Sequence, residues 1–170
     1  TEFITRRDIL LPLMALESWD DGKAKINDKV YDLEKRTWRV KKPGLQDAYR
    51  VFASKLSSSI DPNSGLIKVA ISSKSPVLAQ QWITWLVEDL NNSMRDWEIN
   101  EAKRSVFFLE KKLEDTVSVD MRTMFFRLIQ KQTETIMLAN VREDYLFRVV
   151  DPAIIPEIKS SPNRAVICIL

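Results

Sequence analysis

The feature that most constrains this chain is residues 77–151, which contain neither glycine nor proline. Apolar residues recur there at steps of three and four, the spacing that places side chains on one helix face. They are Ala79, Ile83, Leu86, Leu90, Met94 and Trp97 and, after a slip in phase, Ala102, Val106, Leu109 and Leu113. Ser75 and Pro76 supply a hydroxyl N-cap and a first-turn proline. We therefore predict one continuous helix over residues 75–115, on the order of 60 Å long.

A second helix is predicted to return beside the first. Thr116, Val117 and Ser118 interrupt the helical propensity, and Ser118 is placed to cap residues 119–141. Two long helices joined by a few residues form an antiparallel helical hairpin. Helices in ordinary domains average about three turns. Helices this long therefore need partner helices or a row of identical copies.

The other residues are predicted to form a smaller base. We expect a helix over residues 5–16, capped by Thr5 and weakened by Pro12. The expected elements after it are a loop with a short helical or extended piece (19–39), an amphipathic helix (45–56), a turn (62–65) and a strand (66–72). Around that turn two possibilities stay open, a β-hairpin or a single strand that enters and leaves one turn.

Residues 145–151 form the second expected strand, which would pair with the first. Pro152, Pro156 and Pro162 predict an extended run after it. The six apolar residues 165–170 fit either a short terminal strand or the start of a membrane helix, which needs about 20 apolar residues. The fold class is thus α+β: an α/β base with a small mixed sheet, and a long protruding helix that forms an extended hairpin with its returning partner.

Composition excludes several classes of function. The chain has no histidine and a single cysteine, Cys168, so it lacks the commonest general base and the ligands of a structural zinc site. Its three glycines, Gly22, Gly44 and Gly65, form no phosphate-binding loop. Lys+Arg 26 and Asp+Glu 24 are interspersed without a concentrated positive segment, which argues against nucleic acid as a partner. We expect no enzyme activity and no cofactor. Because the sequence begins at Thr1 without a signal peptide, we expect it to be a piece of a longer protein.

The candidate interaction residues lie on the long helix. Trp85, three residues after Trp82, is either a core residue or an anchor for a neighbouring copy, since aromatic side chains carry much interface energy. The polar middle of the helix is either a solvated face or a charged seam between copies. The candidate oligomer contacts are Trp85, Arg95, Glu98, Glu101 and Lys103.

The order of motifs along residues 45–164 resembles the Wzz-type polysaccharide co-polymerases, the chain-length determinants of bacterial surface polysaccharide. The segments that carry the likeness include Asp47-Ala48-Tyr49, Ser75-Pro76-Val77-Leu78-Ala79, Phe108-Leu109-Glu110, Met137-Leu138-Ala139, Tyr145-Leu146-Phe147 and Val149-Val150-Asp151-Pro152-Ala153. The tail of Pro156, Lys159, Pro162 and Arg164 completes the pattern. The likeness lies in spaced residues and their order, not in a catalytic motif.

The resemblance implies a non-enzymatic regulator of O-antigen chain length in the bacterial inner membrane. The family has a membrane helix at each end and a periplasmic domain between them, and its copies assemble into a ring that works with a polysaccharide polymerase and lipid-linked polysaccharide. On this basis residues 1–74 and 142–158 would form the membrane-proximal base and residues 75–141 the helical extension. Residues 159–170 would lead into the second membrane helix.

Three other functions stay open on the sequence. A co-polymerase coupled to a cytoplasmic tyrosine kinase would continue into a nucleotide-binding domain after residue 170. A helical sensor domain of a membrane receptor would form dimers with a discrete small-molecule pocket. A soluble coiled-coil adaptor would have no membrane spans in its full-length sequence.

Overall fold

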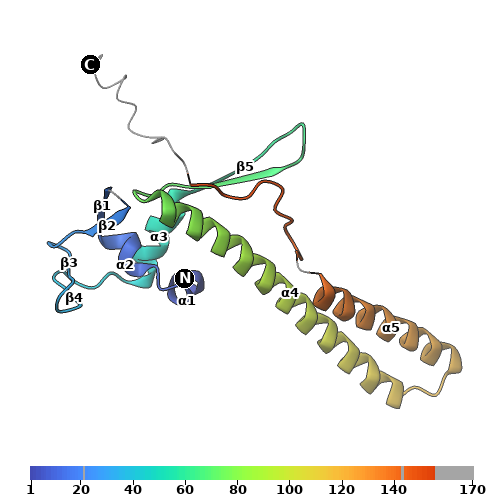
Figure 1. The fold of residues 1–170 in the computed structure, drawn as a ribbon. Helices are drawn as coiled ribbons and strands as arrows, with labels where there is room; N and C mark the ends of the chain where they lie inside the picture. Colours follow the sequence, from blue (N-terminus) through green and yellow to red (C-terminus); the bar gives the residue numbers. More distant parts are fainter. Residues whose placement is uncertain (21, 143, 156–170) are drawn as a thin grey trace. The chain divides into compact units, whose positions relative to one another are not determined.

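The computed structural model describes residues 1–20, 22–142 and 144–155 and confirms an α+β fold with a long helical hairpin (Figure 1). These residues divide into two units, one formed by Thr1–Trp85 with residues 152–155 and the other by Leu86–Asp151. The predictions about Pro156, Pro162, Cys168 and residues 156–170 lie outside the described residues.

The first unit begins with two short helices where one was predicted over residues 5–16. They are α1 (Glu2–Arg6) and α2 (Leu10–Ala15). Asp8 separates them at φ +47°, in the left-handed region that ends a helix. Pro12 lies in the first turn of α2, where its missing N–H costs no helical hydrogen bond. Thr5 lies inside α1 and therefore does not cap it.

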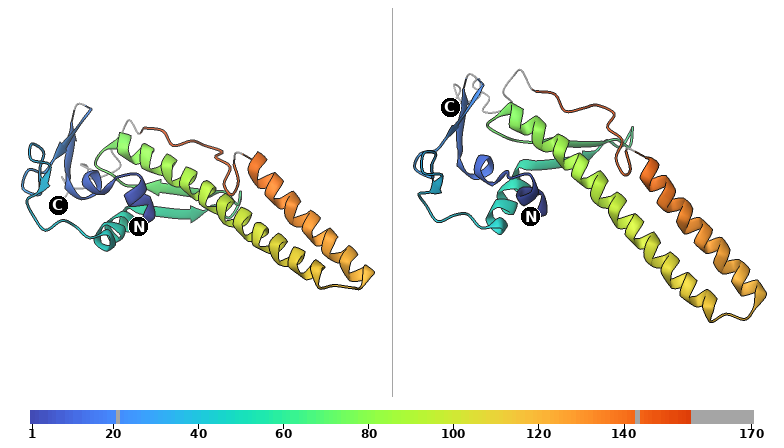
Figure 2. Two further views of the ribbon diagram at one scale, coloured as in Figure 1. Left: turned by 90° about the horizontal axis from the view of Figure 1, so that it is seen from below. Right: turned by 60° about the horizontal axis from the view of Figure 1, so that its bottom comes forward.

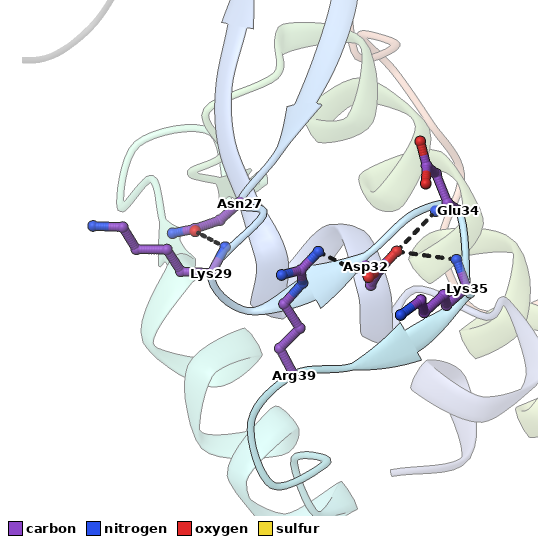
Figure 3. Close-up of polar contacts among 6 residues, drawn as sticks. All are labelled: Asn27, Lys29, Asp32, Glu34, Lys35 and Arg39. Atoms are coloured by element: carbon purple, nitrogen blue, oxygen red, sulfur yellow. Dashed lines mark hydrogen bonds and ion pairs between the residues drawn. The ribbon is translucent and has the colours of Figure 1, made fainter.

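Residues 16–38 form two small hairpins, more regular structure than the predicted loop. β1 (Leu16–Asp20) pairs antiparallel with β2 (Lys23–Ile26), and β3 (Tyr31–Asp32) pairs with β4 (Thr37–Trp38). The β3–β4 turn is held by Asp32, whose Oδ1 accepts the backbone N–H groups of Glu34 at 3.1 Å and Lys35 at 3.0 Å (Figure 3). Its Oδ2 accepts a hydrogen bond from Arg39 Nη2 at 2.8 Å.

The next helix and hairpin agree with the sequence. α3 (Leu45–Lys55) is the helix predicted over residues 45–56, and it is one residue shorter than predicted. β5 (Leu56–Ile60) and β6 (Ile67–Ile71) form an antiparallel hairpin around the predicted turn, with Gly65 at φ +69°. The hairpin is therefore the correct one of the two possibilities. The described strands form three separate two-stranded antiparallel sheets, so the single mixed sheet was wrong.

The core of this unit is built by α1, α2, α3 and the first turns of α4 (Pro76–Glu114). Trp82 is 1 % exposed and lies beside Phe52, with ring centroids 6.2 Å apart. Phe3 also packs against Phe52, with ring centroids 5.2 Å apart. Ser75 is buried, and its Oγ accepts the Leu78 N–H at 3.1 Å, which confirms the predicted N-cap.

In the second unit α4 and α5 (Val119–Val141) run antiparallel side by side (Figure 2). α4 is continuous over its 39 residues, as predicted, and α5 has the predicted bounds. Ser118 occupies the N-cap position of α5, although its side chain makes no capping hydrogen bond. The helical hairpin is therefore confirmed.

The predicted strand over residues 145–151 does not form. Its backbone is bonded by side chains of α4 and not by a strand: Asn91 binds Leu146 and Phe147, within the second unit. In the first unit Gln80 Nε2 donates to the carbonyl oxygen of Ala153 at 3.0 Å. Amide side chains thus provide hydrogen bonds that a neighbouring strand would have supplied.

Candidate oligomer interface on the helical hairpin

Asn91 fixes the segment that follows α5 to the side of α4. Its Oδ1 accepts the backbone N–H groups of Leu146 at 3.0 Å and Phe147 at 2.8 Å, and its Nδ2 donates to the Phe147 carbonyl at 2.9 Å. Asn91 is 7 % exposed, so these bonds satisfy an amide that would be costly to bury alone. We call the contacts of Asn91, Arg95 and Glu98 with Arg142 and residues 145–147 the polar clasp.

Two of the predicted interface residues belong to the polar clasp. Arg95 Nη2 donates to the carbonyl oxygen of Arg142 at 2.7 Å. The hydroxyl of Tyr145 donates to Glu98 Oε2. This hydrogen bond to Glu98, with the cost of burying the phenolate, raises the pKa of the Tyr145 phenol above its usual value of 10.0. Arg95 and Glu98 therefore have a role within one chain, whatever they contact in another.

The other three predicted residues lie apart from the clasp. Trp85 belongs to the first unit, where it is half-buried on the core and the Arg7 guanidinium lies 5.2 Å from its ring centroid. Glu101 accepts a hydrogen bond from Arg104 Nη2 at 2.7 Å. Lys103 is exposed and lines a shallow depression with Trp97, Asn100, Arg104 and Phe107. The five residues do not form one site.

The contact between α4 and α5 is narrow. The buried apolar residues of this unit are Ala102 and Leu113 on α4 and Ala139 on α5, at 2 %, 9 % and 0 % exposure. Small side chains allow two helices to approach closely, but they bury little apolar area. Most large apolar side chains of the hairpin therefore lie outside this seam.

One side of the hairpin, which we call face A, carries apolar residues from both helices. Glu101 and Phe108 on α4 line a shared groove of about 590 Å³ with Leu128 on α5, which places them on one side. Residues at helical spacing from these extend the face. Its large apolar members, each at least 40 % exposed, are Leu90, Trp97, Phe108, Met121, Met124 and Leu128.

The opposite side, face B, is also apolar in part. Residues two apart on a helix point about 200° from each other, so Phe126 lies across the seam from Leu128, and Lys103 across from Glu101. Continuing at helical spacing, Met137, Val119 and Val141 join Phe126 on α5. Their exposed fractions run from 56 % for Phe126 to 79 % for Val141.

The two faces carry opposite net charge over the stretch where α4 and α5 lie side by side. Face A has three basic residues and two acidic residues, a net charge of +1: Arg104, Lys112, Lys131, Glu101 and Asp120. Face B has two basic residues and three acidic residues, a net charge of −1: Lys103, Arg122, Asp96, Glu110 and Glu114. All ten are exposed. Arg122 also donates to the loop carbonyls of Leu113 and Thr116.

Comparison with known proteins adds no family: a scan against protein-family models and a search of curated proteins both return no match. Among the described residues, none of the helices combines the length and apolar character that crossing a bilayer requires. In the same part of the chain, no three carboxylate, thiol or imidazole side chains gather as metal ligands would.

Sequence reasoning missed both the polar clasp and the paired faces. A signal for the clasp was present, because Asn91, Arg95 and Glu98 precede Ala102 at steps of four, three and four. These three polar residues therefore extend the buried side of α4 towards its N-terminus. The apolar run ending at Trp97 instead lies on another side of α4, which explains the slip in phase.

Proposed function

We propose that this chain is the periplasmic part of a Wzz-type regulator of surface polysaccharide length. It acts without catalysis, as a homo-oligomeric scaffold of the bacterial inner membrane. Its partners are a polysaccharide polymerase and lipid-linked polysaccharide. The family resemblance of residues 45–164 supplies the activity, and the two faces of the α4–α5 hairpin are the observation that carries the assembly.

The exposed apolar side chains of the hairpin favour burial by neighbours. Isolated exposed apolar residues are ordinary on soluble proteins, but contiguous apolar surface on both sides of a thin two-helix layer is typical of interaction sites. Face A combines its apolar residues with a charge of +1, and face B combines its own with −1. Each face is therefore complementary to the other and not to itself.

Complementarity between different faces determines the symmetry. When face A of one copy meets face B of the next, the contact is heterologous, and repeated contacts close into a ring if the rotation permits. A sensor domain that forms dimers through one self-complementary patch would use an isologous contact instead. The pattern of charge thus favours the scaffold over the sensor.

A charge swap tests this assembly. Lys112→Glu with Lys131→Glu converts face A to net negative, and like charges across the contact should reduce the oligomer to smaller species in analytical ultracentrifugation. Adding Glu110→Lys and Glu114→Lys on face B should restore the original mass.

The matched control is Lys41→Glu with Lys42→Glu, the same charge change at two exposed lysines outside the hairpin, which should leave the mass unchanged. An oligomer that tolerates reversal of face A, or that is not restored by the compensating reversal of face B, would contradict heterologous packing of the hairpins.

A further inference from the structure

Residues 23–42 carry far more positive charge than the chain as a whole. They contain eight basic residues against three acidic ones, a net charge of +5, whereas the full chain has +2. The basic members are Lys23, Lys25, Lys29, Lys35, Arg36, Arg39, Lys41 and Lys42. The expectation that no segment concentrates positive charge is therefore wrong here. We call residues 23–42, which include β2 and the β3–β4 hairpin, the basic segment.

All eight basic side chains are exposed, and few of them are neutralised locally. Lys25 lies 3.6 Å from Glu17, and Arg39 lies 2.8 Å from Asp32. Among the residues that the structure describes, the other six have no ion-pair partner. Asp32 already accepts hydrogen bonds from Arg39 and from two backbone N–H groups of the turn (Figure 3). The outward charge of the segment is therefore strongly positive.

The same segment also exposes apolar and aromatic groups. Leu33 at the tip of the β3–β4 hairpin is 54 % exposed, and Val40 just after β4 is 48 % exposed. Tyr31 and Trp38 are cross-strand partners whose rings meet edge to face at 5.2 Å, and both remain half-buried. The hairpins β1–β2 and β3–β4 lie next to each other in the views of Figures 1 and 2.

Cations combined with aliphatic tips and amphipathic aromatics match the chemistry of an anionic lipid surface. Lys and Arg bind headgroup phosphates, Trp and Tyr prefer the interface between water and lipid, and aliphatic side chains enter the acyl boundary. A nucleic acid would bind the same cations through its phosphates, but those phosphate contacts bury no apolar surface of Leu33 or Val40. The apolar tips therefore favour the bilayer.

We infer that the basic segment docks on the headgroup layer of a membrane rich in anionic phospholipid, with Leu33 and Val40 inserted at the surface. The inference goes beyond the proposed scaffold and does not depend on it. The vesicle experiment tests variants of the basic segment, and the oligomer-mass experiment tests variants of the α4–α5 hairpin. Either proposal can therefore fail while the other holds.

The test is partitioning of the purified chain onto unilamellar vesicles, measured by flotation, with phosphatidylcholine alone or mixed with phosphatidylglycerol. We expect binding only to the mixed vesicles, and binding that weakens as salt shortens the Debye length from about 10 Å to about 3 Å. Lys35→Gln with Arg36→Gln, and separately Lys41→Gln with Lys42→Gln, should each lower the partition coefficient roughly fivefold per residue. Leu33→Ser should lower it about tenfold.

The matched control is Lys111→Gln with Arg127→Gln on the α4–α5 hairpin, which removes the same charge and should leave partitioning unchanged. Far-ultraviolet circular dichroism of each variant verifies that it is folded. The inference is overturned by equal binding to both kinds of vesicle, by no binding to either, or by equal losses in the control. It is also overturned if duplex DNA binds as tightly as the mixed vesicles and Leu33→Ser changes neither.

Discussion

At the scale of single residues, the polar clasp shows how side chains can replace a strand. The amide of Asn91 offers an acceptor and a donor in one plane, the pattern that a peptide group offers to a neighbouring strand. It therefore binds the extended backbone of Leu146 and Phe147 without a sheet. A polar residue in the buried seam of a helix here anchors a non-helical segment.

The first prediction concerns Asn91→Ala, which removes the three hydrogen bonds that Asn91 makes in the polar clasp. Leaving the partner backbone groups without protein partners should destabilise the unit by about 1–3 kcal/mol. Amide hydrogen exchange at Leu146 and Phe147 should accelerate, as followed by NMR. Asn91→Asp keeps the acceptor for both N–H groups and should lose less protection. Unchanged exchange in Asn91→Ala would contradict the anchoring role.

The second prediction concerns alkaline pH. The hydrogen bond to Glu98 raises the pKa of Tyr145 in the folded state above its usual value of 10.0. A group with a raised folded pKa contributes stability fully below the unfolded value, and loses it as pH rises through the folded pKa. The clasp should therefore loosen above about pH 10.

Ultraviolet titration of tyrosinate provides the measurement, because the chain has only three tyrosines. The parent chain should show a tyrosinate step at high pH, and this step should be absent from Tyr145→Phe. If the two profiles differ only in amplitude, the Tyr145–Glu98 bond does not persist in solution.

At the scale of elements, helices and strands with strong local sequence signals could be predicted. Elements whose formation depends on residues far away in the sequence could not. α4, α5, α3 and the β5–β6 hairpin follow from helical period, capping residues and turn chemistry. The break at Asp8 and the short strands β1–β4 have weak periodicity. Residues 145–151 have the composition of a strand, but whether a strand forms depends on a hydrogen-bonding neighbour, and α4 provides side chains instead.

The third prediction tests the narrow seam between α4 and α5. Ala139 is fully buried, so Ala139→Leu should force the helices apart and destabilise the hairpin by about 1–3 kcal/mol. Glu134→Leu, on the exposed outer edge of α5, should change stability by less than about 0.5 kcal/mol. Urea unfolding followed by circular dichroism measures both. Equal stability of the two variants would show that the helices do not approach closely at Ala139.

At the scale of the whole molecule, the interface that we propose consists of two faces and not of the individual residues that the sequence singled out. Glu101 and Lys103 were among the predicted contacts, and they fall on faces A and B. Arg95 and Glu98 bind the polar clasp, and Trp85 packs on the core of the other unit. Periodicity alone could not separate these roles, because the direction of α5 and of residues 145–147 decides which side of α4 is covered.

We propose that contact between face A and face B sets the length of a surface polysaccharide. The most direct test is the gel profile of surface polysaccharide from a strain that lacks its chain-length regulator and carries the full-length protein containing this chain. The parent protein should restore a modal length, Lys112→Glu with Lys131→Glu should broaden the distribution, and the compensating Glu110→Lys with Glu114→Lys should bring the mode back. A mode that survives reversal of face A, or that the compensating reversal does not restore, would show that contact between the two faces does not set the length.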